Sequence, residues 1–102
     1  MPIAWYAGLF EGEGWITIHK QCKHVRVGIK MTDLDILQRF HNEFGGYLTP
    51  AKKTKEHYKD VWEWRMGEAN AVKSFLHACL PFFGERRAYQ SANAFDRLDS
   101  VF

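Results

Sequence analysis

The feature that most constrains the fold of this chain is a change of hydrophobic period that occurs twice in the same order. Residues 2–12 have helical spacing, and the segments WITIHKQ and HVRVGIKMT then alternate apolar and polar residues, as half-buried strands do. A second helical segment ends at Gly45 and Gly46, and two more strand candidates follow, YLTPAKK and KDVWEWRM. Hairpins pair antiparallel, so the pattern predicts one four-stranded antiparallel sheet with helices on one face.

Two further helices complete the expected architecture. Residues 68–80 carry an apolar stripe, and residues 85–100 form a last helix with Ala88, Ala92 and Phe95 inward. Thr32 and Asp35 have the spacing of a capping box at the start of the second helix. A chain of 102 residues is one domain by ordinary expectation. We therefore predict a single α+β domain over residues 1–102, with αββαββα order plus a C-terminal helix.

The basic residues are concentrated on the expected sheet. The net charge is only +2, so an argument for nucleic-acid binding depends on where the charges lie. Residues 15–32 contain four basic residues and no acid, whereas most acids fall on helices. This segregation favours binding to a DNA groove. The expected DNA-binding residues are Thr17, His19, Gln21, Lys23, Arg26, Lys30, Lys52, Lys53, Lys55 and Arg65. A plain alternative is that exposed strands use polar residues and lysines to prevent edge pairing.

The first helix has a smooth stripe made of Ala4, Gly8 and Gly12, spaced four residues apart. Small residues at this spacing let two helix backbones approach closely. If the partner is the same helix of a second copy, a two-fold axis brings the two copies of Glu13, just past the helix end, side by side. Two such carboxylates repel each other unless a divalent cation lies between them. The alternative is that Glu11 and Glu13 simply lie in a solvated loop.

The stretch YAGLFEGEG, residues 6–14, resembles the LAGLIDADG motif, and the αββαββα order resembles the homing endonuclease fold of that name. The segment LPFFGERRAYQ is similar to that family's Leu-Pro-aromatic segment, followed by a basic pair and Gln. The resemblance covers nearly the whole chain. It implies a site-specific DNA endonuclease, an RNA maturase that aids intron splicing, or a non-cleaving DNA-binding regulator.

The resemblance also implies roles for individual residues. Glu13 takes the position of the metal-binding acid, usually Asp, and would hold Mg²⁺ or Mn²⁺. Arg86 stands where the family usually has Lys and, with Lys30, joins Glu13 as an expected catalytic residue. The expected dimer interface consists of Ala4, Gly8, Glu11 and Gly12.

We therefore expect a homodimeric, Mg²⁺-dependent endonuclease that cuts double-stranded DNA at a pseudo-palindromic site. The alternatives are a non-cleaving DNA-binding regulator or RNA maturase on the same fold, and an interaction module without nucleic acid. No segment approaches the length of about 18 apolar residues that a membrane span needs. The expected location is the cytoplasm (nucleoid) or an organellar matrix, without secretion.

Overall fold

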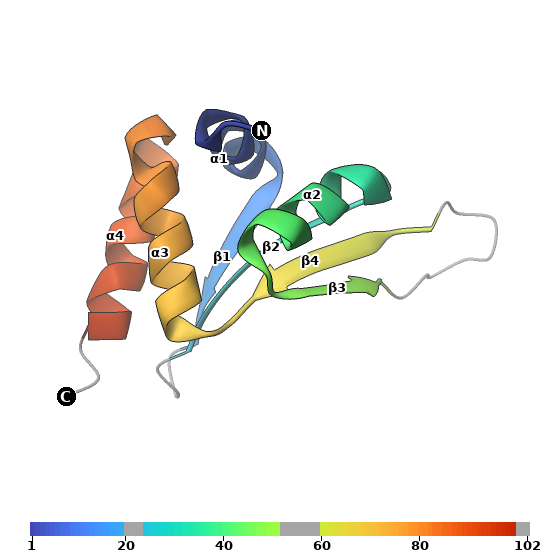
Figure 1. Cartoon of the computed structure of the whole chain (residues 1–102). Coiled ribbons are helices and arrows are strands. Elements are labelled where there is room, and N and C mark those ends of the chain that lie inside the picture. The colour runs from blue at the N-terminus through green and yellow to red at the C-terminus, as the bar shows by residue number, and fades with distance from the viewer. Residues whose placement is uncertain (20–23, 52–59, 100–102) are drawn as a thin grey trace.

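The computed structural model describes residues 1–19, 24–51 and 60–99. Two helix-strand-strand units follow each other, and a third helix, a short 3-10 helix and a longer last helix come after them (Figure 1). The elements are α1 (Ile3–Glu13), β1 (Gly14–Ile18), β2 (Val25–Met31), α2 (Leu34–Phe44), β3 (Tyr47–Pro50), β4 (Trp62–Met66), α3 (Ala69–Cys79), η1 (Leu80–Phe82) and α4 (Glu85–Asp99). None of the described helices is long and apolar enough to cross a membrane.

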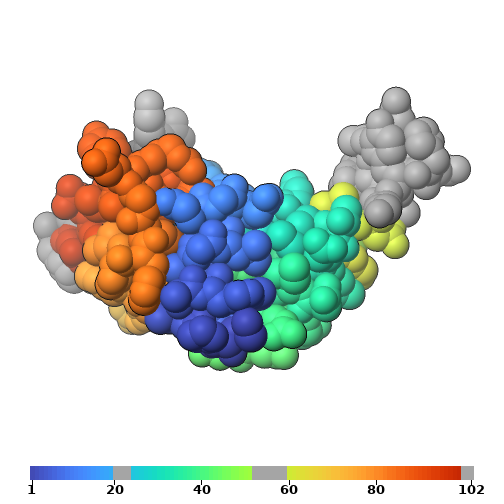
Figure 2. All heavy atoms as spheres, turned by 90° about the horizontal axis from the view of Figure 1, so that it is seen from above, coloured from blue at the N-terminus to red at the C-terminus, as the bar shows by residue number. Residues whose placement is uncertain are grey.

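The four strands form one antiparallel sheet in the order β1-β2-β4-β3. The second strand of each unit lies in the centre, and the first strand of each unit forms an edge. The helices pack against one face of this sheet (Figure 1). Seen from above, α1 lies between α2 on one side and the α3 and α4 pair on the other (Figure 2). The predicted α+β class and the four-stranded antiparallel sheet with helices on one face are confirmed.

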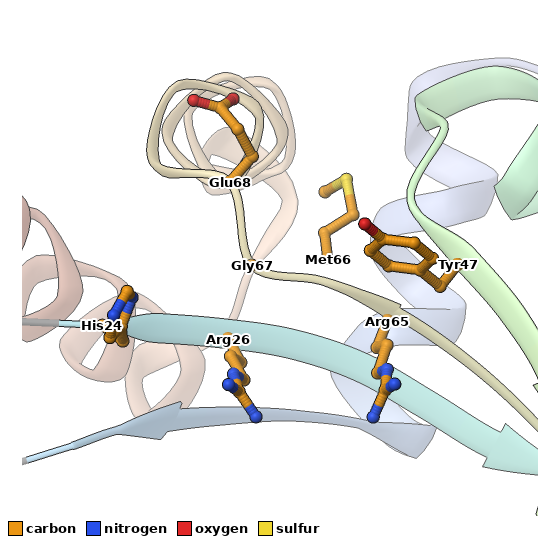
Figure 3. A pocket seen from close by; sticks show the side chains of 7 residues that line it. All are labelled: His24, Arg26, Tyr47, Arg65, Met66, Gly67 and Glu68. Atoms are coloured by element: carbon orange, nitrogen blue, oxygen red, sulfur yellow. The ribbon is translucent and has the colours of Figure 1, made fainter.

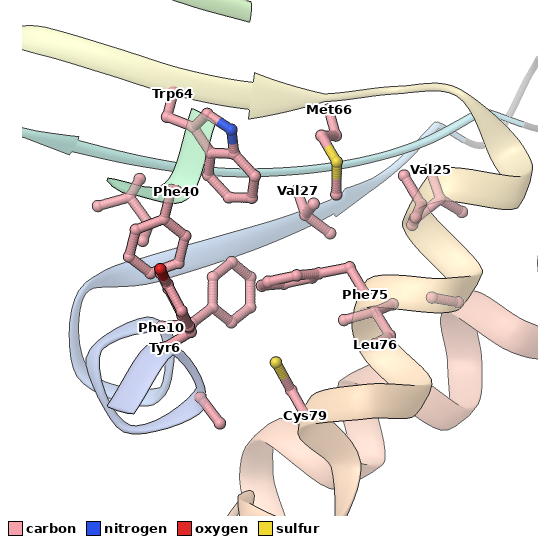
Figure 4. Packing of buried hydrophobic residues seen from close by; sticks show 14 of the residues in the cluster. Tyr6, Phe10, Val25, Val27, Phe40, Trp64, Met66, Phe75, Leu76 and Cys79 are labelled. Carbon is pink, nitrogen blue, oxygen red and sulfur yellow. The ribbon is translucent and has the colours of Figure 1, made fainter. Parts of the chain in front are cut away.

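An aromatic core joins the sheet to the helices (Figure 4). Trp64 of β4 is fully buried, its ring centre lies 5.0 Å from that of Phe40, and its indole N–H donates to the carbonyl of Gly45 at 2.8 Å. Phe10 of α1 meets Phe75 of α3 edge to face at 5.0 Å. Truncating such a side chain to alanine costs about 3–5 kcal/mol, so α1 and β4 are fixed firmly in the core.

Two local expectations are wrong. Helix α2 begins after Asp33 with no side-chain cap, so Thr32 and Asp35 form no capping box. Helix α3 is capped instead by Glu68, whose carboxylate accepts from two backbone N–H groups of the first turn. On α4 the expected inner face is off by about one position. Its buried residues are Arg87, Ser91, Ala94 and Leu98.

Candidate nucleic-acid interface and acidic helix end

The sheet face opposite the helices gathers those sequence-predicted binding residues that the structure describes. The register pairs Thr17 with Arg26, Gly28 with Arg65, and Lys30 with Glu63, and these positions alternate with buried ones. The arginines and lysine are exposed, and Arg26 and Arg65 point in the same direction from neighbouring strands (Figure 3). His19 is also exposed and follows β1 in the same phase. The predicted segregation of basic groups onto this face is therefore present.

In the middle of this open face, the missing side chain of Gly28 leaves room for the ring of Trp15. The ring of Trp15 lies over Gly28, and any Cβ there would clash with that ring and with the carbonyl of Trp64. A bulky residue at this position would push Trp15 off the sheet. An aromatic ring thus lies on the open face between the exposed basic residues Arg26 and Lys30 of β2.

Two residues on the open face were missed by sequence reasoning. Tyr47 opens β3, is 66% exposed and pairs across the sheet with Arg65. Glu63 lies beside Lys30, whose Nζ is 3.9 Å from the Glu63 carboxylate. Glu63 alternates with buried Trp64 along β4, and Tyr47 alternates with Leu48, the partner of Trp64, along β3; this alternation was the signal that could have found both. With His24, Arg26, Arg65 and the Met66–Glu68 segment, Tyr47 lines a hollow of about 320 Å³ (Figure 3).

Five of the predicted DNA-binding residues lie outside the described residues. They are Gln21, Lys23, Lys52, Lys53 and Lys55.

The second part of the site is the C-terminal end of α1, where the structure corrects the expected boundary. Glu13 is the last residue of the helix and does not lie past its end, because the N–H of Gly14 still bonds to the carbonyl of Phe10. Gly14 is required here for space, since an added Cβ would clash with the Phe10 ring. The helix therefore enters β1 without a loop. Glu13 is exposed, at the border between helix and sheet.

Glu11 turns toward its own chain. One carboxylate oxygen accepts from the N–H of Gly84 at 2.6 Å, and the other lies 3.6 Å from Nε of Arg87. The structure thus gives Glu11 a role within the subunit, and its part in a dimer interface stays a prediction.

The two arginines that precede Ala88 have different environments. Arg87 is 3% exposed, and its guanidinium donates to the carbonyls of Glu11 and Gly14 at 3.1 and 2.9 Å. Burial, and then the neighbouring Arg86, lower the pKa of Arg87, while Glu11 opposes that shift. Arg86 is exposed and reaches the carbonyl of Glu11 at 3.4 Å.

The three expected catalytic residues are therefore on elements that meet. Arg86 reaches the last turn of α1, which ends at Glu13. Lys30 follows Ile29, the residue that pairs with Gly14 at the start of β1. Charge of both signs is thus present where the helix, the sheet and α4 come together.

A metal site is not complete within one copy of the described residues. No three His, Cys, Asp or Glu side chains gather in residues 1–19, 24–51 and 60–99. Glu13 offers a hard carboxylate oxygen with access to solvent, the kind of ligand that Mg²⁺ uses once or twice alongside phosphate oxygens. Glu13 fits such an ion as one ligand, with the others coming from outside the subunit.

The outer face of α1 is bare. Ala4, Gly8 and Gly12 are all exposed, and a Cβ added at either glycine would meet nothing within 4 Å. The fold of the single chain gives no steric reason for these glycines, each of which costs about 1 kcal/mol relative to Ala in a helix.

Solved structures similar to this chain are those of homing endonucleases. I-CvuI bound to its target in the presence of 2 mM Ca gives a TM-score of 0.69 at 18% identity, over 97% of this chain and 68% of that one. I-CvuI with the I-CreI target and 2 mM Mg, where the DNA is not cleaved, gives 0.66 at 18% identity with the same coverage. The chain has the homing endonuclease fold.

A further homing endonuclease, I-TnaI, gives a TM-score of 0.64 at 17% identity, over 88% of this chain and 67% of that one. These neighbours are LAGLIDADG homing endonucleases, so the expected fold is confirmed. No model of a known protein family matches the sequence. The homing endonuclease fold places the open sheet face and the end of α1 in a scaffold that, in I-CvuI, holds a DNA target.

Proposed function

We propose that the protein is a site-specific endonuclease for double-stranded DNA that acts as a homodimer and hydrolyses phosphodiester bonds with Mg²⁺ or Mn²⁺. The observation that carries the proposal is the exposed carboxylate of Glu13 at the end of a helix with a bare outer face, beside a basic open sheet. A protein that only bound DNA would have little use for an acid at that point, because it repels phosphate.

The proposed homodimer would form through the exposed outer face of α1. Two copies of the Ala4-Gly8-Gly12 stripe could pack closely around a two-fold axis, which would give the exposed glycines a purpose. A two-fold axis repeats each surface, so the target would contain two roughly palindromic half-sites. The same axis brings two copies of Glu13 together at the border of the two sheets.

Glu13 from each copy, with phosphate oxygens of the DNA, would hold the divalent ion. When bound, the ion supplies Lewis-acid stabilisation and a water of lowered pKa. Arg86 is always cationic, so it cannot act as a base, and it would stabilise the negative charge that develops on the phosphate. Lys30 would orient the attacking water from the sheet side, or it would stabilise the same negative charge on the phosphate.

The open sheet face would bind the DNA groove. Arg26 and Arg65 are exposed and directed alike, and an arginine pairs best with the two acceptors of guanine. Thr17 and His19 would add polar contacts, and Tyr47, missed by the sequence, offers a ring beside Arg65. Gln21, Lys23, Lys52, Lys53 and Lys55 remain expected DNA contacts.

To test the proposal, the protein is incubated with a randomised duplex DNA library in Mg²⁺. The cleaved and the bound but uncleaved DNA molecules are then sequenced separately. A recurrent palindromic site in the cut fraction supports the proposal. Recurrent sites in the bound fraction alone, with no cutting in Mg²⁺ or Mn²⁺, would favour a DNA-binding regulator. Selective retention of structured RNA over duplex DNA in a parallel RNA library would favour a maturase.

A further inference from the structure

The C-terminal end of α1 presents an electrostatic problem. A helix C-terminus carries partial negative charge, so acids there are unfavourable and cations are favourable. Helix α1 ends with Glu11 and Glu13 and has no basic residue in its own last turn. In the proposed dimer two such ends would meet. Something outside the helix must stabilise this acidic end.

Arg87 supplies that cation from the far end of the sequence. Its Nη2 group donates both to the carbonyl of Glu11 and to that of Gly14, which lie on either side of Glu13. Its Nη1 group donates to the side chain of Gln90 at 2.8 Å, and its guanidinium carbon lies 5.2 Å from the centre of the Phe10 ring. One planar group therefore fixes the carbonyls before and after Glu13.

Gly84 completes the arrangement. Its N–H donates to Glu11, and a Cβ at this position would lie 2.7 Å from the same carboxylate oxygen. Any side chain at Gly84 would therefore displace Glu11. The Glu11 oxygen near Arg87 and the Nε of Arg87 are buried without a hydrogen-bond partner, so their ion pair depends on this placement.

We propose that Arg87 is a positioning residue, which holds the last turn of α1 so that Glu13 is presented in one fixed place. This inference rests on the proposed function, in which Glu13 holds the divalent ion. Arg87 itself is buried and does not touch DNA or metal in this view. Its contribution is to remove the freedom of the helix end before the target arrives, because misplacing a reactive group by a small distance slows a reaction strongly.

The test variant is Arg87→Lys, which keeps the positive charge but replaces the rigid fork by a single flexible ammonium. The control is Asp99→Asn, on the same helix α4 as Arg87, which removes an exposed ion pair between Asp99 and Lys73 of α3. Three quantities are measured: amide hydrogen exchange of Gly14, which bonds to Phe10 at the helix end, exchange of the core strand β2, and single-turnover cleavage with saturating DNA.

In Arg87→Lys we expect exchange at Gly14 to accelerate about tenfold or more while exchange in β2 changes little, because the opening is local. Cleavage should slow by about tenfold or more at saturating DNA, with binding in EDTA within about threefold of the parent. Asp99→Asn should match the parent in all three measurements.

Equal acceleration at Gly14 and in β2 would overturn the proposal, since Arg87 would then serve global stability alone. Unchanged exchange at Gly14 would overturn it too. If Arg87→Lys does not fold, Gly84→Ala is measured in the same way, because it disturbs Glu11 while leaving Arg87 in place. If the parent protein never cleaves, the proposed function fails, but the exchange measurement still decides whether Arg87 holds the helix end.

Discussion

Helices α1 and α2 open the two halves of the sheet, and both contain eleven residues. Aligned by their length, the exposed stripe of Ala4, Gly8 and Gly12 in α1 corresponds to Asp35, Arg39 and Glu43 in α2. One helix exposes small uncharged residues and the other exposes charge. Both bury aromatic residues against the sheet. The two helices therefore differ in the residues of their outer faces and resemble each other in the aromatic residues they pack inward.

The two helices also end differently. Helix α1 runs straight into β1 through Gly14, whose φ of −83° is an ordinary value. Helix α2 ends at Gly45 and Gly46, with φ of 77° and 85°, in the left-handed region that favours glycine. The end of α2 is thus a common turn that reverses the chain. The end of α1 instead carries an acid to the border of the sheet.

Replacing Glu13 with Gln tests the largest proposed difference between the two helix ends. Loss of a metal-binding carboxylate removes several kcal/mol of stabilisation. Single-turnover cleavage in Mg²⁺ should therefore slow by about 100-fold or more. Gel-shift binding in EDTA should stay unchanged or tighten, because a negative group near phosphate is gone. Glu43→Gln, in the last turn of α2, should change neither measurement, and an equal loss in both variants would remove the proposed distinction.

Gly8→Leu tests the outer faces. A Cβ added at Gly8 meets nothing within 4 Å in its own subunit, so we expect the monomer to fold as before. In the dimer the helices would be forced apart at a cost of about 1–3 kcal/mol. The dissociation constant of the dimer should therefore rise about 5- to 150-fold, as measured by sedimentation with and without DNA. Glu43→Leu on α2 is the control and should not shift assembly. A Gly8→Leu protein as dimeric as its parent would mean that α1, like α2, faces solvent.

The two central strands can be compared in the same way, since Arg26 of β2 and Arg65 of β4 point in the same direction on the open face (Figure 3). Each arginine that reads a guanine contributes about 1–3 kcal/mol of discrimination. Arg26→Ala and Arg65→Ala should each relax the preference at a different base pair of the half-site. Sequencing of the DNA bound by each variant from a randomised library measures this. A uniform weakening across all sequences would instead identify them as phosphate contacts.

The smallest expected effects concern the glycines of the two helices. Gly45→Ala should lower the free energy of unfolding by about 1–2 kcal/mol, because φ of 77° is strained for a residue with a Cβ. Gly12→Ala should raise the unfolding free energy of the monomer by about 0.5–1 kcal/mol, since alanine favours a helix. Urea unfolding at a concentration that keeps the protein monomeric compares the two. Destabilisation by Gly12→Ala in the monomer would show that α1 needs this glycine for its own fold.

Much of the fold could be predicted because the hydrophobic periodicity and the glycines that end the elements indicate the same boundaries. The alternation in VRVGIKM correctly placed Val25, Val27 and Ile29 inside, although Gly28 is buried too under Trp15, and Gly45 and Gly46 marked the end of α2 correctly. The small stripe on α1 was also found to be exposed. These features depend on neighbours within a few residues, which a sequence displays directly.

The environment of Arg87 could not be predicted in the same way. An arginine on a helix is expected outward, and Ala88 and Ala92 seemed the natural inner face of α4. Arg87 can be buried because its guanidinium donates to the carbonyls of Glu11 and Gly14 and pairs with the Glu11 carboxylate. These partners lie more than seventy positions earlier in the chain. Its neighbour Arg86, which the resemblance suggested as a catalytic residue, reaches the carbonyl of Glu11, and its catalytic role stays a prediction. Position along α4 alone does not distinguish the two.

The ring of Trp15 over Gly28 has a practical consequence for following this protein in solution. Trp64 is sealed in the core, whereas Trp15 lies half-buried on the open face, between rows that carry Arg26 and Lys30. Indole fluorescence responds to the polarity around the ring, so emission from Trp15 will change when a large molecule covers this face. Trp15→Phe would remove this part of the emission while keeping an aromatic ring over Gly28, and the emission of Trp5, Trp62 and Trp64 would remain as a reference.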